Sequence, residues 1–191
     1  MPKLTSIISK GFGDEKEIEF SIVTAMEIIA EIGKHYPDMV MTAMPILQDG
    51  LKRFEKTKTP RILAAIIYAM ACIGKNQPSL AKSIVPQFLT LLKHQNFFVR
   101  GHAAWALGYI KSEGEQAKEA IEALARLARL FGDNSKFILI GLDKTVSVRD
   151  MARRAIRSIE GRGVVFGSEK NTSEKKSSLT KKSRRDKKTI R

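Results

Sequence analysis

Apolar residues recur every three to four positions between residues 14 and 161, which is the spacing of one face of an α-helix. In the first segment, Ile18, Ile22 and Ile29 form an apolar stripe, while the glutamates lie mostly off it. The same pattern continues through six further segments that short breaks separate: 38–54, 60–73, 80–93, 97–110, 115–131 and 145–159. The sequence therefore predicts an all-α protein whose first helix has an acidic outer face.

The segment "FILIGL" at 137–142 is the one ambiguous piece of this pattern. Its composition is typical of a β-strand, but a single strand would have no partner in a helical chain. We expect a loop or a short helical turn there.

Two stretches of eight residues, "AEIGKHYP" and "ACIGKNQP", start 41 positions apart and share five letters. In each copy we expect a helix to end at the glycine, Gly33 or Gly74, in the left-handed conformation that closes a helix C-terminus. Pro37 and Pro78 then suit the first turn of the next helix. Each copy is interpreted as a corner between two helices.

Weaker third and fourth copies follow, because "VRGHAAWALGYI" at 99–110 matches "VRDMARRAIRSI" at 148–159. Spacings of 41, 37 and 49 residues separate the isoleucines at the four corners: Ile32, Ile73, Ile110 and Ile159. Periods near 40 residues with two helices per unit are typical of a helical solenoid.

The stretch "VRGHAAWALGYI" resembles the second helix of a HEAT repeat, especially the short prokaryotic kind with Val-Arg, a small pair, Ala-Leu-Gly and a final Ile. "LLKHQNFFVR" and "LDKTVSVR" resemble the turn that precedes such a helix. The resemblance implies a right-handed α-solenoid of about four helical hairpins over residues 14–161, with an insertion around 132–142. Residues 1–13 are then a lead-in and residues 162–191 a tail.

Alignment of the four corners makes Glu27, Tyr68, Trp105 and Arg154 equivalent, five residues before each isoleucine. In HEAT-like helices this position usually faces outward, so the resemblance implies a surface for a partner. Our candidate partner-binding residues surround that position: Tyr68, His102, Trp105, Tyr109, Arg149, Arg153, Arg154 and Arg157. The alternatives are burial of the aromatic side chains against a neighbouring helix and a merely solvated arginine face.

The chain carries 34 Lys and Arg against 20 Asp and Glu, an excess of +14 that is uneven. Residues 168–191 hold ten basic and three acidic groups, whereas residues 1–33 hold three basic and six acidic ones. We expect the tail to be disordered and to bind polyanions, although it could act only as a solubilising segment. Its candidate polyanion-binding residues are Lys181, Lys182, Arg184, Arg185, Lys187 and Lys188. An acidic first unit and a basic last unit also allow weak head-to-tail association of an otherwise monomeric chain.

The sequence contains no pattern typical of an enzyme active site, a metal site or a cofactor site. The three histidines are scattered, no phosphate-binding loop is present, and Cys72 stands alone in an apolar run. We predict no catalytic residue, no metal and no cofactor. No apolar run approaches the length of a membrane span or a signal peptide, so we expect a cytoplasmic protein.

Two classes of function remain open. The first is a non-catalytic scaffold that binds a protein partner, expected to be acidic, on the surface of the second helices. The second is a nucleic-acid-binding protein that uses the tail and the last arginine-rich helix. HEAT-like DNA glycosylases, for which Asp150 is the acid we nominate, and bilin-lyase accessories are remoter alternatives.

Overall fold

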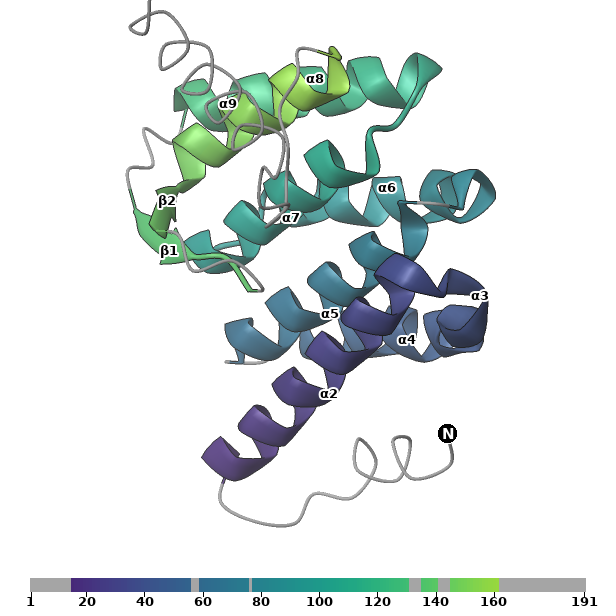
Figure 1. The fold of residues 1–191 in the computed structure, drawn as a ribbon. Helices are drawn as coiled ribbons and strands as arrows, with labels where there is room; N and C mark the ends of the chain where they lie inside the picture. Colours follow the sequence, from purple (N-terminus) through teal and green to yellow (C-terminus); the bar gives the residue numbers. More distant parts are fainter. Residues whose placement is uncertain (1–14, 56–58, 76, 131–134, 141–144, 162–191) are drawn as a thin grey trace, which may run out of the picture.

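A computed structural model of the chain describes residues 15–55, 59–75, 77–130, 135–140 and 145–161 (Figure 1). The prediction of a mostly helical protein is confirmed. Its helices are α2 (Glu15–His35), α3 (Pro37–Val40), the short 3₁₀ helix η1 (Met41–Ala43), α4 (Met44–Phe54), α5 (Pro60–Gly74), α6 (Pro78–Leu91), α7 (Phe97–Ile110), α8 (Gly114–Leu130) and α9 (Val148–Ile159). Two strands, β1 (Lys136–Ile138) and β2 (Thr145–Ser147), lie between α8 and α9.

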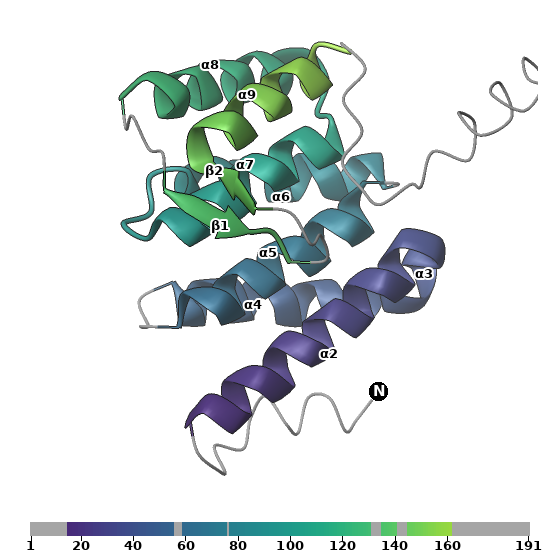
Figure 2. The same cartoon turned by 60° about the vertical axis from the view of Figure 1, so that its left-hand side comes forward.

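The core lies around a row of four helices. Helix α2 packs against α5, α5 against α7, and α7 against α9, while α4, α6 and α8 each pack against the helix that follows them in the chain (Figures 1 and 2). The interior helices of the row are the most deeply buried, since every residue of α7 from Val99 to Ile110 is buried. A buried hydrogen bond, from Ser158 Oγ to the Gly108 carbonyl at 2.8 Å, also joins α9 to α7.

The glycines of the first two corners do not act as predicted. Helix α2 ends at His35 and α5 at Gly74, close to the expected positions, and Pro37 and Pro78 begin the next helices. However, neither Gly33 nor Gly74 has a positive φ. A Cβ on Gly33 would lie 2.7 Å from Ile73 Cγ1, and one on Gly74 would lie 2.6 Å from Ile84 Cδ1. These glycines are therefore needed for close packing between helices, not for a left-handed turn.

The left-handed conformation occurs at the two later corners instead. After α7 it is adopted by Lys111, with φ of 56°, and after α9 by Gly161, with φ of 75°. The Lys111 N–H donates to the Leu107 carbonyl and closes the end of α7.

Two prolines shape the outer helices. The segment 38–54, predicted as one helix, is divided at η1, because Pro45 at the start of α4 has no N–H to donate and cannot continue the preceding turn. Pro86 lies inside α6 and leaves the Lys82 carbonyl without its intrahelical donor. Gln116 Nε2 of α8 donates to that carbonyl at 2.9 Å, so the gap in α6 becomes a link between the two outer helices.

The prediction of a loop or helical turn at 137–142 is wrong for its first residues. β1 and β2 form a two-stranded antiparallel ribbon in which Phe137 lies opposite Val146. The strand at 136–138 finds its partner at 145–147, which the helical pattern had assigned to the start of the last helix. Helix α9 begins later, at Val148, where the Ser147 side chain accepts a hydrogen bond from the Asp150 N–H.

The predictions for residues 1–13 and for the tail, including its lysine and arginine cluster, lie outside the described residues. Among the helices that the structure describes, none combines the length and apolar character needed to cross a membrane.

The packing role of Gly33 predicts a loss of stability in Gly33→Ala. The added methyl meets the Ile73 side chain and comes within 3.4 Å of its backbone, so α2 and α5 must separate. We expect a loss of about 1–3 kcal/mol in the free energy of unfolding, measured by urea denaturation. Gly50→Ala is the matched control, because its Cβ would meet only the flexible end of Ile66 at 3.2 Å. Equal stability changes in the two variants would contradict the packing role.

Candidate functional site

A groove of about 950 Å³ lies on the side of the molecule formed by α2, α5, the start of α7 and the β-ribbon. Its size is in the range of ligand and peptide sites. We call this hollow the groove, and the residues that line it are Val23, Glu27, Glu31 and Lys34 from α2, Pro60, Arg61 and Tyr68 from α5, residues 96–98 at the start of α7, and residues 136–140 from β1 and the chain after it.

The groove has an apolar rim. Phe97, at the start of α7, is 37% exposed, and Ile138, on β1, is 60% exposed. Large apolar side chains that stay this open to water have not been used to build the core. They offer apolar contact area to a bound molecule.

Charges of both signs surround that apolar rim. On α2, Glu31 is 2.7 Å from Lys34 Nζ, and Glu19 is 3.7 Å from Arg61 Nε. Glu27 and Lys136 form no ion pair with any described residue and remain available to a bound molecule. The groove can therefore accept a ligand that carries both apolar and charged groups.

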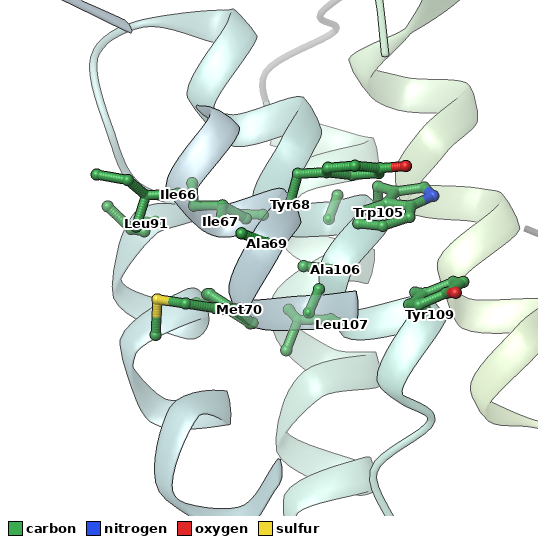
Figure 3. Close-up of a cluster of buried hydrophobic side chains, with 14 of the residues drawn as sticks. Ile66, Ile67, Tyr68, Ala69, Met70, Leu91, Trp105, Ala106, Leu107 and Tyr109 are labelled. Atoms are coloured by element: carbon green, nitrogen blue, oxygen red, sulfur yellow. The ribbon is translucent and has the colours of Figure 1, made fainter. Parts of the chain in front are cut away.

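Three of the predicted aromatic residues form a buried stack beside the groove (Figure 3). The rings of Tyr68 and Trp105 are 5.0 Å apart, and those of Trp105 and Tyr109 are stacked at 4.7 Å with 19° between their planes. We call this stack the aromatic ladder. Trp105 is only 2% exposed, and its two neighbours are also buried. The expectation that Tyr68 and Trp105 face outward is therefore wrong, and the packing alternative holds for them.

Two lysines cover the ends of the aromatic ladder. Lys34 Nζ lies 5.4 Å from the ring centre of Tyr68, and Lys75 Nζ lies 4.4 Å from that of Tyr109, both within cation–π range. Burial lowers the pKa of Lys34, but hydrogen bonds to Glu31 and Tyr68 outweigh it and raise the pKa overall. Burial raises the pKa of Tyr109 to about 12. Burial also raises the pKa of Tyr68, so Lys34 stays charged and both tyrosines stay neutral at physiological pH.

The fourth predicted aromatic residue, His102, has a different role from the ladder. Its ring is fully buried, Nε2 accepts a hydrogen bond from the Ile140 N–H at 3.1 Å, and Nδ1 lies 2.8 Å from the Phe98 carbonyl. Since Nε2 must accept, the proton is on Nδ1 and is donated to Phe98. Burial lowers the pKa of His102 to about 4, so the ring is neutral at pH 7. His102 therefore joins the end of the β1 segment to α7.

Phe137 provides the second attachment of the ribbon to α7. Its ring lies over Gly101, where an added Cβ would come within 2.3 Å of the ring atom Cζ. It also contacts the ring of Phe98 edge-on at 6.0 Å and that of His102 at 5.4 Å. The wall of the groove that β1 forms is thus held in place by one aromatic side chain and one histidine.

The predicted arginines lie on α9, whereas the aromatic ladder is formed by α5 and α7. Arg153, Arg154 and Arg157 are exposed, and none forms an ion pair with a described residue; Arg149 is half-buried. Asp150, the acid nominated for a glycosylase, exchanges hydrogen bonds with Ser147 at the start of α9. That arrangement is a helix cap.

The remaining titratable groups of the described residues form no metal site and no reactive thiol. Within the described residues, no group of three or more His, Cys, Asp or Glu side chains could hold a metal ion. Cys72 is a buried free thiol, and burial raises its pKa to about 12. A thiol of that pKa is unreactive at neutral pH.

Sequence reasoning missed most of the groove. Glu27 and Tyr68 entered the repeat alignment and 137–142 was noted only as an ambiguous segment, but Arg61 and Phe97 were not singled out. For β1 a signal existed, since "FILI" and "TVSV" are two β-rich runs separated by a short Gly- and Asp-containing segment. For Arg61 and Phe97 no local pattern distinguishes a groove residue from any other residue in a first helical turn.

Comparison of the chain with models of protein families, with curated proteins and with solved structures finds no match. The resemblance to HEAT repeats therefore stays a prediction from the residues quoted above.

The neutral state of His102 predicts acid sensitivity. Its folded pKa of about 4 lies below the ordinary histidine value of 6.5, so the unfolded chain binds the proton more tightly between these two pH values. The contribution of the neutral His102 to the free energy of unfolding is fully present above pH 6.5. It decreases by about 3 kcal/mol between pH 6.5 and pH 4 and does not change further below pH 4. Denaturant unfolding across pH 4–7 measures the slope.

In His102→Gln this slope should flatten, whereas His35→Gln, which changes an exposed histidine, should keep it. Hydrogen exchange at the Ile140 amide should accelerate in acid in the wild-type chain, because a protonated Nε2 cannot accept its hydrogen bond. Parallel pH curves for the wild-type chain and His102→Gln would contradict the assignment.

Proposed function

We propose that this protein is a non-catalytic scaffold that binds an extended segment of a protein partner in the groove. The observation that carries the proposal is the combination of exposed Phe97 and Ile138 with the uncommitted charges of Glu27 and Lys136 in one hollow. Peptide sites typically pair apolar contact area with a few charges that fix orientation. The groove lies where the second helices of the predicted repeats meet, which is where we expected a partner.

The same proposal includes an α-solenoid of HEAT type. The row α2, α5, α7 and α9 supports it, because each of these helices contacts the next one in the row and α5, α7 and α9 each pack on the helix before them in the chain. In a stack of this kind each unit touches only its neighbours, and binding surfaces run along the row.

The charge of α9 supports an acidic partner. Three exposed arginines, Arg153, Arg154 and Arg157, have no carboxylate to neutralise them within the described residues. Such a face steers acidic molecules toward the protein. The acidic α2 at the other end of the row is a weaker complement to it, so head-to-tail self-association remains a prediction.

Those exposed arginines also favour a second candidate function, nucleic-acid binding. Uncompensated arginines bind phosphates, and the ten basic groups in residues 168–191 would add salt-dependent affinity. A glycosylase is not supported, because the nominated acid, Asp150, is engaged in the cap of α9.

If the groove is the binding site, binding of a partner depends on the apolar side chains of its rim. We expect Phe97→Ser/Ile138→Ser to weaken capture of one or more proteins from a lysate of the source cells at least tenfold, measured by quantitative mass spectrometry with the purified full chain as bait. Phe20→Ser/Ile28→Ser is the matched control, since it removes the same two types of exposed apolar side chain from α2 outside the groove. Equal losses in both variants, or none in either, would contradict the groove as the site.

The nucleic-acid alternative is tested by duplex DNA and RNA binding against salt. If the scaffold proposal holds, a chain that ends at Gly167 should lose nearly all binding, because only the tail supplies non-specific affinity. Salt-sensitive binding that survives truncation and disappears in Arg153→Glu/Arg157→Glu would favour nucleic acid as the ligand of α9. Full-length Arg153→Glu/Arg157→Glu, compared with full-length wild type, separates the two contributions.

A further inference from the structure

One edge of β1 has no partner within the described residues. The sheet contains only β1 and β2, so each strand pairs along one side. A two-stranded ribbon is marginal by itself, and the open edge of a strand offers N–H and C=O groups to another strand. In this chain the ribbon is held to α7 by Phe137 and by the hydrogen bond of Ile140 to His102, so its open edge is already in position.

The register shows which backbone groups point outward. The Val148 N–H donates to the Ser135 carbonyl at 3.3 Å, and hydrogen-bonded pairs alternate along an antiparallel ribbon. Phe137, opposite Val146, therefore turns its N–H and C=O toward β2. Lys136 and Ile138 turn theirs to the open edge.

That open edge borders the groove. All residues of β1 line the groove and none of β2 does. In Figure 2 β1 lies on the side of α5 and β2 on the side of α9, and Figure 1 agrees. The side chains of Lys136 and Ile138 are exposed, while that of Phe137 is buried under the ribbon.

We infer that the partner's segment binds as a third strand along the open edge of β1, an inference that rests on the proposed function of the groove. Its main chain exchanges hydrogen bonds with Lys136 and Ile138. Cross-strand pairing then calls for an acidic residue beside Lys136 and an apolar one beside Ile138, where Phe97 adds contact area. The occupant is an extended segment of another protein in which an acidic and an apolar residue lie two positions apart, on the same face of the strand.

The chain's own tail is a poor occupant. Helix α9 begins next to β2 and its 12 residues rise about 18 Å away from the ribbon. To reach β1 from the end of α9, the chain would have to span roughly 20 Å, which takes about the six residues 162–167. These residues include the tail's one apolar run, which would then not be available for the edge. What remains, residues 168–191, carries ten basic groups and is repelled by Lys136.

The test uses a display library of nine-residue peptides, half with an acidic and an apolar residue two positions apart and half random, selected on the full-length protein. We expect enrichment of the patterned half. With the selected peptide bound, hydrogen exchange followed by NMR should slow at least tenfold at the amides of Lys136 and Ile138, which point to the open edge. Phe137, whose amide already faces β2, should change little.

Two proline variants sharpen the readout. Ile138→Pro removes one outward N–H and should weaken the selected peptide at least tenfold. Thr145→Pro is the matched control, because Thr145 lies opposite Ile138 and its N–H points to the other edge of the ribbon. N-methylation of alternate peptide amides should reproduce the loss. Denaturant unfolding curves of both variants are compared with that of the wild-type chain to check that each variant keeps the fold.

The outcomes separate the two proposals. A peptide that needs Phe97 and Ile138 side chains but leaves the Lys136 and Ile138 amides unprotected, and that binds Ile138→Pro normally, overturns strand addition while the groove remains a site. Enrichment of a helical pattern with apolar residues three and four apart does the same. A library without any groove-dependent binder overturns the proposed function and, with it, this inference. Peptide binding that tightens at least tenfold on truncation at Gly167 would show that the tail competes for the edge, and overturns the choice of a partner over the tail.

Discussion

Close approach between neighbouring helices is the constraint on which this structure depends. Gly33 lets α2 come within contact of Ile73 of α5, and Gly74 of α5 accommodates Ile84 of α6. Alanines fill much of the remaining interface, since Ala64, Ala69 and Ala104 are fully buried. Small side chains at these points allow helix backbones to approach, and larger ones would push the row apart. The position of every later element follows from that spacing.

The groove depends on the same principle at a third glycine. Gly101 has no side chain, and the ring of Phe137 occupies the space directly over it, so the ribbon is seated on the start of α7. His102, one residue further on, holds the following backbone through a neutral ring. One side of this wall rests on α7, which is buried in the core. The other side is open, because β1 pairs only with β2 among the described residues.

The repeat alignment misplaced the aromatic residues for an identifiable reason. The repeat alignment makes Glu27, Tyr68, Trp105 and Arg154 equivalent, yet the first and last are exposed and the middle two are buried. The helices α5 and α7 lie inside the row with a neighbour on each side, whereas α2 and α9 are its first and last described members. One position in a repeat therefore meets protein in the middle of the row and solvent at its ends. An alignment compares local sequence and contains no information on how many neighbours a helix has.

Local chemistry accounts for what could be read from the printed residues. Helical periodicity, prolines at helix starts and the corner spacing predicted the helices to within a few residues, because these features depend on contacts within one or two turns. The division at Pro45 and the pairing of "FILI" with "TVSV" were also encoded locally but were interpreted wrongly.

The groove could be decided only in three dimensions. It joins Glu27, Arg61, Phe97 and Lys136, which are far apart in the chain and share no spacing. The roles of the glycines, the neutral state of His102 and the open edge of β1 likewise depend on which helix lies against which. Packing between distant segments sets them, and periodicity records only which face of each segment is apolar.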